Sequence, residues 1–166
     1  MHKKKLMAEM EKYYGEDENR INHTRRVLSY AEKIMANSKN LDFDREIVVY
    51  TAILHDVGIP IAEEKYGSAV GKYQEREGPP IARNIMEGCN VAESVIKEVC
   101  EIIANHHSPG VIDTDNFKVF YDADWLVNLP AEYDLPENRK ETKNIIDKIY
   151  FTEAAKEIAR NEFIQE

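Results

Sequence analysis

Apolar residues recur at helical spacing along most of the chain. Between residues 20 and 36 they fall at steps of three and four, which places them on one face of an amphipathic helix. Residues 47–57 are apolar on all sides, which is typical of a helix at the centre of a domain. Asp44 precedes this run as an N-cap and Gly58 ends it. The pattern therefore predicts a central helix that amphipathic helices cover.

The rest of the chain predicts further helices. They are expected over residues 4–14, 92–106 and 116–128, with two more amphipathic helices after residue 137. Residues 62–78 contain three glycines and many charges, which predicts a loop or lid with a short helix inside it. Pro79 and Pro80 predict the start of another helix, which Gly88 ends. We expect one all-α domain over residues 1–166, folded as a compact helical bundle.

Composition narrows the class of protein. Hydrophobic residues make up 43% and charged residues 32% of the 166 residues, which is ordinary for a soluble globular protein. A formal charge of −9 argues against a broad nucleic-acid-binding surface. No apolar run approaches the roughly 20 residues that span a membrane, and the two cysteines, Cys89 and Cys100, are expected to be buried and free. We therefore expect a cytoplasmic protein. Exposed apolar residues of the last two helices could support a homodimer.

Polar residues interrupt the apolar helices at a few positions. His55 and Asp56 end the central apolar run, where an ionised carboxylate is costly unless it is paired or binds a metal. Local hydrogen bonds at the end of the helix are one explanation. The other is a metal site, because His23 lies at the rim of an apolar helical face and Asp124 lies in another apolar segment. Two imidazoles and two carboxylates suit Mn, Fe, Co, Ni, Zn or Mg.

Three short motifs contain these residues and stand in a fixed order. They are His23-Thr24-Arg25-Arg26-Val27, Leu54-His55-Asp56-Val57-Gly58 and Ala123-Asp124-Trp125-Leu126. In this order they resemble the HD superfamily of metal-dependent phosphohydrolases, over about residues 17–130. The resemblance implies an HD-type helical domain on which helices from residues 137–166 pack. It also implies one divalent ion, with His23, His55, Asp56 and Asp124 as its ligands.

The resemblance implies hydrolysis of a phosphoester of a small substrate, such as a nucleotide, by water that the metal ion activates. Asp56 is then expected to bind the ion and to orient the nucleophile. Arg26 is expected to clamp a phosphate, since guanidinium pairs well with phosphate oxygens, although it is equally compatible with an ordinary surface arginine. Four more basic side chains are candidate substrate contacts: Lys65, Arg76, His106 and His107. For the two histidines, a solvated pair at a helix C-terminus is the alternative.

The loop between the His55-Asp56 doublet and Asp124 departs from the family pattern. Relatives with two ions have a histidine where this chain has Gln74. Because an amide is a poorer ligand than an imidazole, we expect a single ion. Further candidates in this loop are Glu75 and Glu77 as general bases, and Tyr66 and Tyr73 as stacking or loop-pinning residues.

Three other functions stay open at this point. An HD domain that binds a metal or ligand without turnover, as a sensor or interaction module, is the main alternative. A di-iron oxygenase is the second, but it needs the histidines of a second metal. The third is a helical protein whose histidines are only structural.

Overall fold

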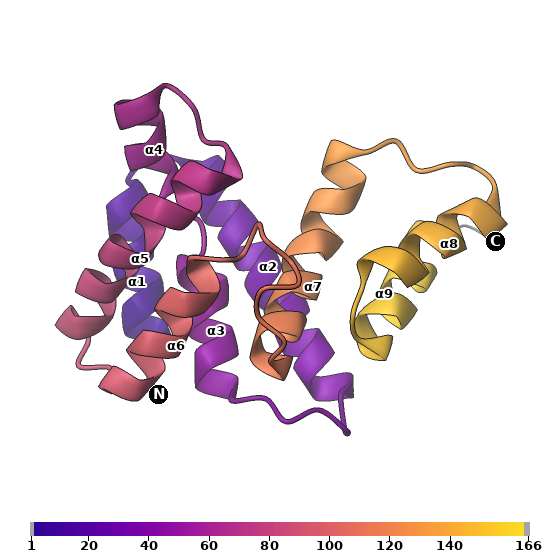
Figure 1. Cartoon of the computed structure of the whole chain (residues 1–166), viewed down its shortest axis with the longest axis horizontal. Coiled ribbons are helices and arrows are strands. Elements are labelled where there is room, and N and C mark those ends of the chain that lie inside the picture. The colour runs from indigo at the N-terminus through magenta and orange to yellow at the C-terminus, as the bar shows by residue number, and fades with distance from the viewer. Residues whose placement is uncertain (1, 165–166) are drawn as a thin grey trace.

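Residues 2–164, the part of the chain that the computed structural model describes, form nine helices and no strand (Figure 1). In chain order these are α1 (Lys3–Tyr14), α2 (Glu18–Asn37), α3 (Arg45–Leu54), α4 (Ile59–Tyr66), α5 (Gly71–Gly88), α6 (Glu93–Ile103), α7 (Asp115–Glu132), α8 (Arg139–Ile149) and α9 (Glu153–Phe163). The predicted all-α fold class is therefore confirmed.

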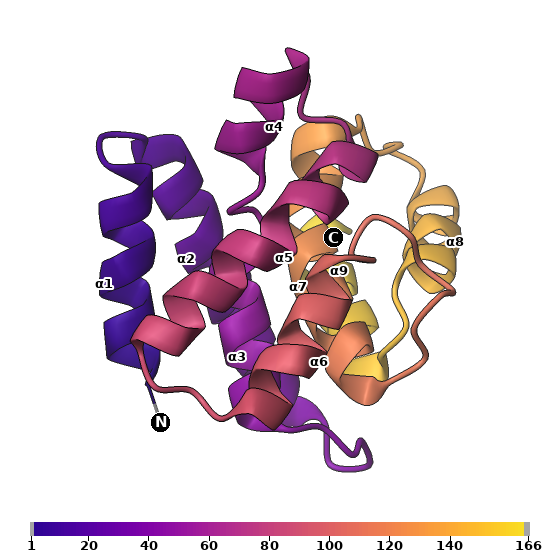
Figure 2. The same cartoon turned by 60° about the vertical axis from the view of Figure 1, so that its left-hand side comes forward.

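Helix α3 lies at the centre of the molecule. Every residue from Ile47 to Leu54 is buried, and the helix packs against α1, α2, α6 and α7. Asp44 caps it by accepting a hydrogen bond of 2.8 Å from the backbone N–H of Glu46. Figure 2 shows α1 and α2 side by side, with α5 crossing in front of α3. The expected central helix is present, but it ends at Leu54, so His55 and Asp56 lie in the turn that follows it.

The segment after this turn is more helical than its sequence indicates. Where we predicted a loop over residues 62–78, α4 and the first turns of α5 are helical and only residues 67–70 lie between them. The predicted helix start at Pro79 is wrong, because α5 runs through both prolines. Gly78 explains part of this, since a residue without Cβ relieves the clash that normally keeps the residue before proline out of a helix. The same glycine packs tightly, because a Cβ there would lie 2.9 Å from Ile103 Cγ2.

Helix α6 ends three residues before the predicted end at His106. The backbone N–H groups of residues 104–106 and 108 still donate to backbone carbonyls, and side chains add further hydrogen bonds at this point. His106 Nδ1 lies 2.7 Å from the carbonyl oxygen of Ile103, and the backbone N–H of His107 donates to Glu75 Oε1 at 3.0 Å. Because Glu75 lies 32 residues away in sequence, no local pattern predicts this ending.

The last two helices are amphipathic, as predicted, and α9 packs against α7 and α2 while α8 packs against α9. Asp122 on α7 fixes the start of α9. It accepts hydrogen bonds from the backbone N–H of Phe151 at 2.9 Å and from the backbone N–H and hydroxyl of Thr152, both at 2.7 Å. Burial raises the pKa of Asp122 to about 6 in spite of these donors.

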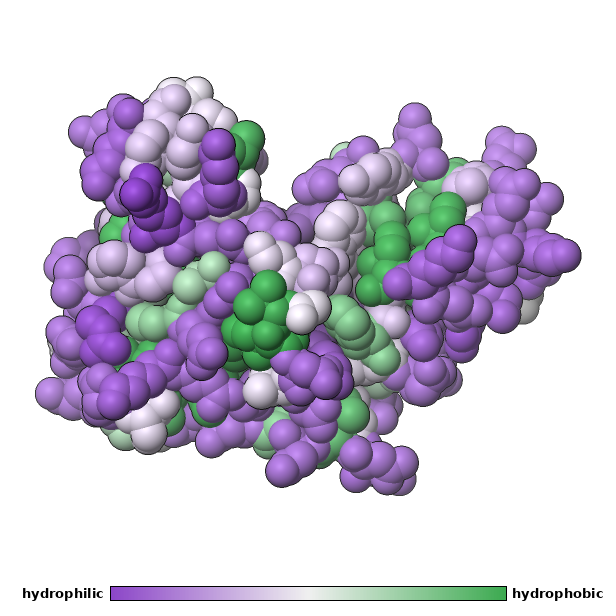
Figure 3. All heavy atoms as spheres, viewed as in Figure 1, coloured by the Kyte–Doolittle hydropathy of each residue, from purple (hydrophilic) through white to green (hydrophobic). Residues whose placement is uncertain are grey.

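The surface carries few large apolar side chains. Figure 3 shows a mostly hydrophilic face with small hydrophobic patches, and a notch between α4 and the α7–α8 connection. The exposed large apolar residues are Tyr66, Val70, Val111, Tyr133 and Phe151. No helix among residues 2–164 has the length and apolar character needed to cross a membrane. Of the two free cysteines, Cys89 is buried and Cys100 is only partly buried.

Candidate metal centre

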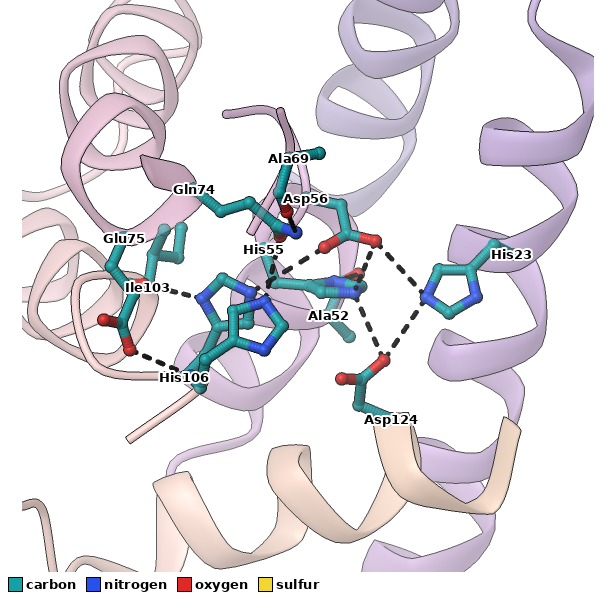
Figure 4. A network of polar contacts seen from close by, with 11 residues as sticks. His23, Ala52, His55, Asp56, Ala69, Gln74, Glu75, Ile103, His106 and Asp124 are labelled. Atoms are coloured by element: carbon teal, nitrogen blue, oxygen red, sulfur yellow. Dashed lines mark hydrogen bonds and ion pairs between the residues drawn. The ribbon is translucent and has the colours of Figure 1, made fainter. Parts of the chain in front are cut away.

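Three elements bring together the four predicted metal ligands (Figure 4). His55 and Asp56 follow directly after α3, His23 comes from α2 and Asp124 comes from α7. His55 is fully buried and Asp124 nearly so, whereas His23 and Asp56 are partly exposed. The site therefore has a closed inner side formed by the core and an open outer side.

The donor atoms of these residues form a ring. His23 Nε2 lies 3.4 Å from Asp56 Oδ2 and 3.3 Å from Asp124 Oδ1. His55 Nε2 lies 3.3 Å and 3.4 Å from the same two oxygens. Ligands about 2.1 Å from an ion are separated by about 3.4 Å in a tetrahedron and about 3.0 Å at right angles. The observed separations fit a divalent ion, although the role of these residues as ligands stays a prediction.

Hydrogen bonding prepares the His55 ring for such an ion. Its Nδ1 lies 3.0 Å from the carbonyl oxygen of Ala52, so Nδ1 carries a proton and Nε2 faces the carboxylates. His55 Nε2 and Asp124 Oδ1 are buried, and neither has a hydrogen-bond partner among the described residues. Unpaired buried polar atoms cost about 1–3 kcal/mol each. A metal ion would satisfy both atoms at once.

The electrostatics of the centre favour a cation. Burial alone lowers the pKa of His55, but Asp56 and Asp124 outweigh it and hold this pKa well above its ordinary value. Burial likewise raises the pKa of the two carboxylates, and the adjacent imidazoles outweigh it, so that both pKa values lie below the usual range. Without an ion, a proton on His55 neutralises the pair of carboxylates only in part. A divalent cation would supply the missing positive charge.

Two more histidines adjoin this centre. His106 is buried, its Nε2 has no hydrogen-bond partner among the described residues, and this atom lies 3.7 Å from Asp56 Oδ1. His107 is exposed on its outer side and packs against His106, with ring centroids 4.0 Å apart. Donor atoms of Asp56, His106 and His107 all lie within 4.8 Å of one another. His106 is therefore no solvated surface residue, and the two histidines share Asp56 with the first donor set.

Burial of its inner side and the neighbouring His106 lower the pKa of His107 to about 4. Its ring is therefore neutral at pH 7 and keeps one nitrogen lone pair. Its Nε2 lies 3.0 Å from Gln74 Oε1, the residue that stands where two-metal relatives have a histidine.

A cleft of about 340 Å³ opens beside the centre. Its lining residues are Asp17, Asn19, Arg20, His23, Asp56 and Ile59. Arg20 is held in place by Asp17, with Nε and Oδ2 2.7 Å apart, and by Glu63, with Nη2 and Oε2 3.0 Å apart. Our sequence reasoning missed Arg20, although its place one turn before His23 on α2 was a readable signal. A larger cleft, about 420 Å³, lies between the α7–α8 connection and the end of α9 and contains none of the candidate ligands.

The predicted substrate contacts are placed less favourably. Arg26 and Arg76 are exposed, and neither lines the cleft beside His23. Lys65 forms an ion pair with Glu77, with Nζ and Oε2 2.8 Å apart. The structure therefore does not gather these three side chains around the centre, and their roles stay predictions.

The other loop candidates are engaged with their neighbours. Tyr66 and Tyr73 stack on each other, with ring centroids 4.1 Å apart. Glu77 also accepts a hydrogen bond from the hydroxyl of Tyr66, at 2.7 Å. Glu75 accepts hydrogen bonds from the 107–108 turn. These contacts join α4 to α5 and α5 to the turn after α6.

Comparison with known proteins places the chain in a family. A family model described as HD domain matches residues 20–148. Among solved structures, the chain is similar to a predicted HD superfamily hydrolase from an uncultured Thermotogales bacterium, with a TM-score of 0.68 and 22% identity over 96% of this chain and 84% of that chain. The comparison with curated proteins gives no match. The structural match supports the fold, and since the family model spans most of the sequence, this chain belongs to the HD domain family.

Proposed function

We propose that this chain is a metal-dependent phosphohydrolase that acts on a small phosphorylated substrate, such as a nucleotide. The observation that carries the proposal is the ring formed by the donor atoms of His23, His55, Asp56 and Asp124 beside a cleft that also contains a guanidinium. The ring fits a divalent ion, and the cleft gives a phosphate group access to it. The same ring also fits a domain that binds a metal without turnover, which is the alternative that the experiment must exclude.

An ion held here would lower the pKa of a water molecule and offset negative charge on a phosphoryl group. The surroundings of both Asp56 oxygens support its proposed role. Oδ2 faces the histidines of the ring, while Oδ1 faces His106 Nε2 at 3.7 Å. One oxygen can therefore hold the ion while the other accepts a hydrogen bond from the nucleophile and orients it.

A cation beside the centre is needed to hold a phosphate. Arg20 lines the cleft, and Asp17 and Glu63 fix its guanidinium. Arg26 lies on the same helix but is exposed. We favour Arg20 as the first phosphate contact and keep Arg26, with Lys65, Arg76 and the two histidines, as proposed contacts of a larger substrate.

Turnover tests the proposal directly. Purified protein is assayed against phosphomonoesters, nucleotides and cyclic dinucleotides with Mn²⁺, Co²⁺ or Mg²⁺. We expect hydrolysis of at least one class, loss of that hydrolysis in His55→Ala and Asp56→Ala, and unchanged activity in the control His2→Ala. His2 lies outside the centre at the start of α1.

Two results decide against the proposal. Activity that survives in His55→Ala would rule out this centre as the site of the reaction. Silence on every substrate, together with a tightly held ligand detected by mass spectrometry, would favour an HD domain without turnover.

A further inference from the structure

Arg20 is bound by two carboxylates that contact different nitrogens of its guanidinium. Asp17 Oδ2 accepts a hydrogen bond of 2.7 Å from Nε, and both oxygens of Glu63 accept hydrogen bonds from Nη2, at 3.1 Å and 3.0 Å. Nη1 donates to no residue in the described part of the chain. Burial lowers the pKa of Arg20, but the hydrogen bonds to Glu63 and Asp17 outweigh it and raise this pKa. The guanidinium is therefore charged, and one of its three nitrogens is free.

Asp17 binds Arg20 from the start of the same helix. It is the N-cap of α2, and its Oδ1 accepts a hydrogen bond of 3.2 Å from the backbone N–H of Arg20 while Oδ2 binds Nε. Asp17 also lines the cleft beside His23. Because Nε is the nitrogen next to the aliphatic stem, this contact holds the guanidinium in the cleft and leaves its terminal edge, Nη1 and Nη2, for a ligand.

Glu63 binds Arg20 from a different element. It lies on α4, whose first residue, Ile59, lines the same cleft. Figure 2 shows α4 at the same end of the molecule as the turn between α1 and α2. The side chain of Glu63 is 51% exposed, and Ala62 is the one buried residue of α4. Exposed ion pairs are weak, so a stronger anion can displace Glu63 from the guanidinium.

A phosphate group at Arg20 needs the nitrogen that Glu63 holds. Guanidinium binds phosphate most strongly through two parallel N–H···O hydrogen bonds. Since Asp17 occupies Nε, the pair that remains is Nη1 and Nη2, and Nη2 donates to both oxygens of Glu63. Phosphate and Glu63 are therefore alternatives at this edge of the guanidinium, whereas phosphate and Asp17 are compatible.

We propose that the two carboxylates have opposite roles in substrate binding. Asp17 is a positioning residue that holds Arg20 in the cleft, and Glu63 is a competitor that the phosphate group of the substrate displaces from Nη2. The proposal rests on the proposed function, since it needs Arg20 as the phosphate contact. It favours a doubly charged phosphoryl group, because a ligand that displaces Glu63 must bind the guanidinium better than a carboxylate does.

Phosphate binding tests the two roles, for which the expected changes have opposite signs. Inorganic phosphate is titrated by calorimetry into the Mn²⁺-loaded full chain. Glu63→Gln should tighten phosphate binding by about three- to fivefold, because it removes the competitor. Asp17→Ser should weaken phosphate binding at least about threefold, because serine still caps α2 but no longer holds Nε. The control Glu64→Gln, which removes the same charge at the next exposed position of α4, should change phosphate binding less than about twofold.

The effect of Glu63 should depend on Arg20. In an Arg20→Gln background, Glu63→Gln should change phosphate binding no more than Glu64→Gln does. Simple removal of negative charge would instead tighten phosphate binding in Glu63→Gln and Asp17→Ser alike, and that result would overturn the proposal. A Glu63→Gln chain that binds phosphate as the wild type does would overturn it too. Should Asp17→Ser fail to fold, Glu63→Gln decides.

The proposal and the proposed function can fail separately. Opposite changes in phosphate affinity, without hydrolysis of any phosphoester, would leave the two roles standing and refute the proposed function. Hydrolysis that is lost in His55→Ala, together with equal phosphate affinity in Glu63→Gln and the wild type, would leave the proposed function standing and overturn the two roles.

Discussion

Binding of a divalent ion should stabilise the folded chain by a predictable amount. The four ring ligands are spread from residue 23 to residue 124, so the unfolded chain does not bring them together. In the folded chain their donor atoms already lie close together, and a bound ion would give His55 Nε2 and Asp124 Oδ1 the partner that they lack among the described residues. An ion that binds the folded state alone adds about 2.7 kcal/mol of stability when its concentration is 100 times Kd. For a chain of this length that corresponds to an increase in Tm of about 5–10 °C.

Thermal melting followed by circular dichroism measures this effect. The protein is melted after treatment with a chelator and again with saturating Mn²⁺ or Zn²⁺. We expect the increase in the wild type and in the control His2→Ala, and no increase in His55→Ala, which lacks one ring ligand. An equal increase in His55→Ala would place the ion elsewhere. A wild type that melts at the same temperature with and without chelator would show that the histidines are structural.

Three more predictions follow from single residues. Relative to Asp122→Asn, the unfolding free energy of the wild type, measured by urea denaturation, should fall by about 3 kcal/mol as the pH rises from below 3.8 to well above 6. The reason is that the raised pKa of Asp122 makes the folded state bind the proton more tightly, and a difference independent of pH would refute this. Arg20→Gln should raise the KM for a phosphorylated substrate at least about tenfold and leave the metal content unchanged, while Arg26→Gln should raise the KM less. A larger increase in Arg26→Gln would identify Arg26 as the phosphate contact instead. Gly58→Ala should lower the unfolding free energy by about 1–3 kcal/mol, because a Cβ there would lie 2.7 Å from the α5 backbone. The control Gly88→Ala should change the unfolding free energy little, because no atom lies within 4 Å of a Cβ there. Equal losses in the two variants would contradict the packing argument.

The sequence was sufficient to predict the helices whose apolar residues recur at regular helical spacing. The apolar faces of α2, α3 and the last two helices follow from spacing alone, and these helices are present in the structure. The His55-Asp56 doublet could be placed at the end of a buried helix, because Leu54 before it favours a helix and Gly58 after it ends one. The convergence of four ligands did not follow from spacing and needed the resemblance to an HD domain.

The sequence was insufficient to predict local structure where contacts with residues distant in the chain determine it. The first turns of α5 looked like a loop because glycine and proline disfavour helix. Their helical form brings Gly78 into close contact with Ile103, a contact that no local pattern in the sequence shows. The end of α6 depends on Glu75, which no window around His106 contains. Arg20 was readable but was passed over, because nothing in the sequence shows that a cleft opens on its side of His23.

The metal content of the purified protein tests the central claim most directly. Elemental analysis is performed on the wild type and on His55→Ala after both are loaded with divalent metal and passed through the same desalting step. The account predicts at least one ion per wild-type chain and only trace metal in His55→Ala. Equal metal content in the two proteins, or only trace metal in both, would contradict it.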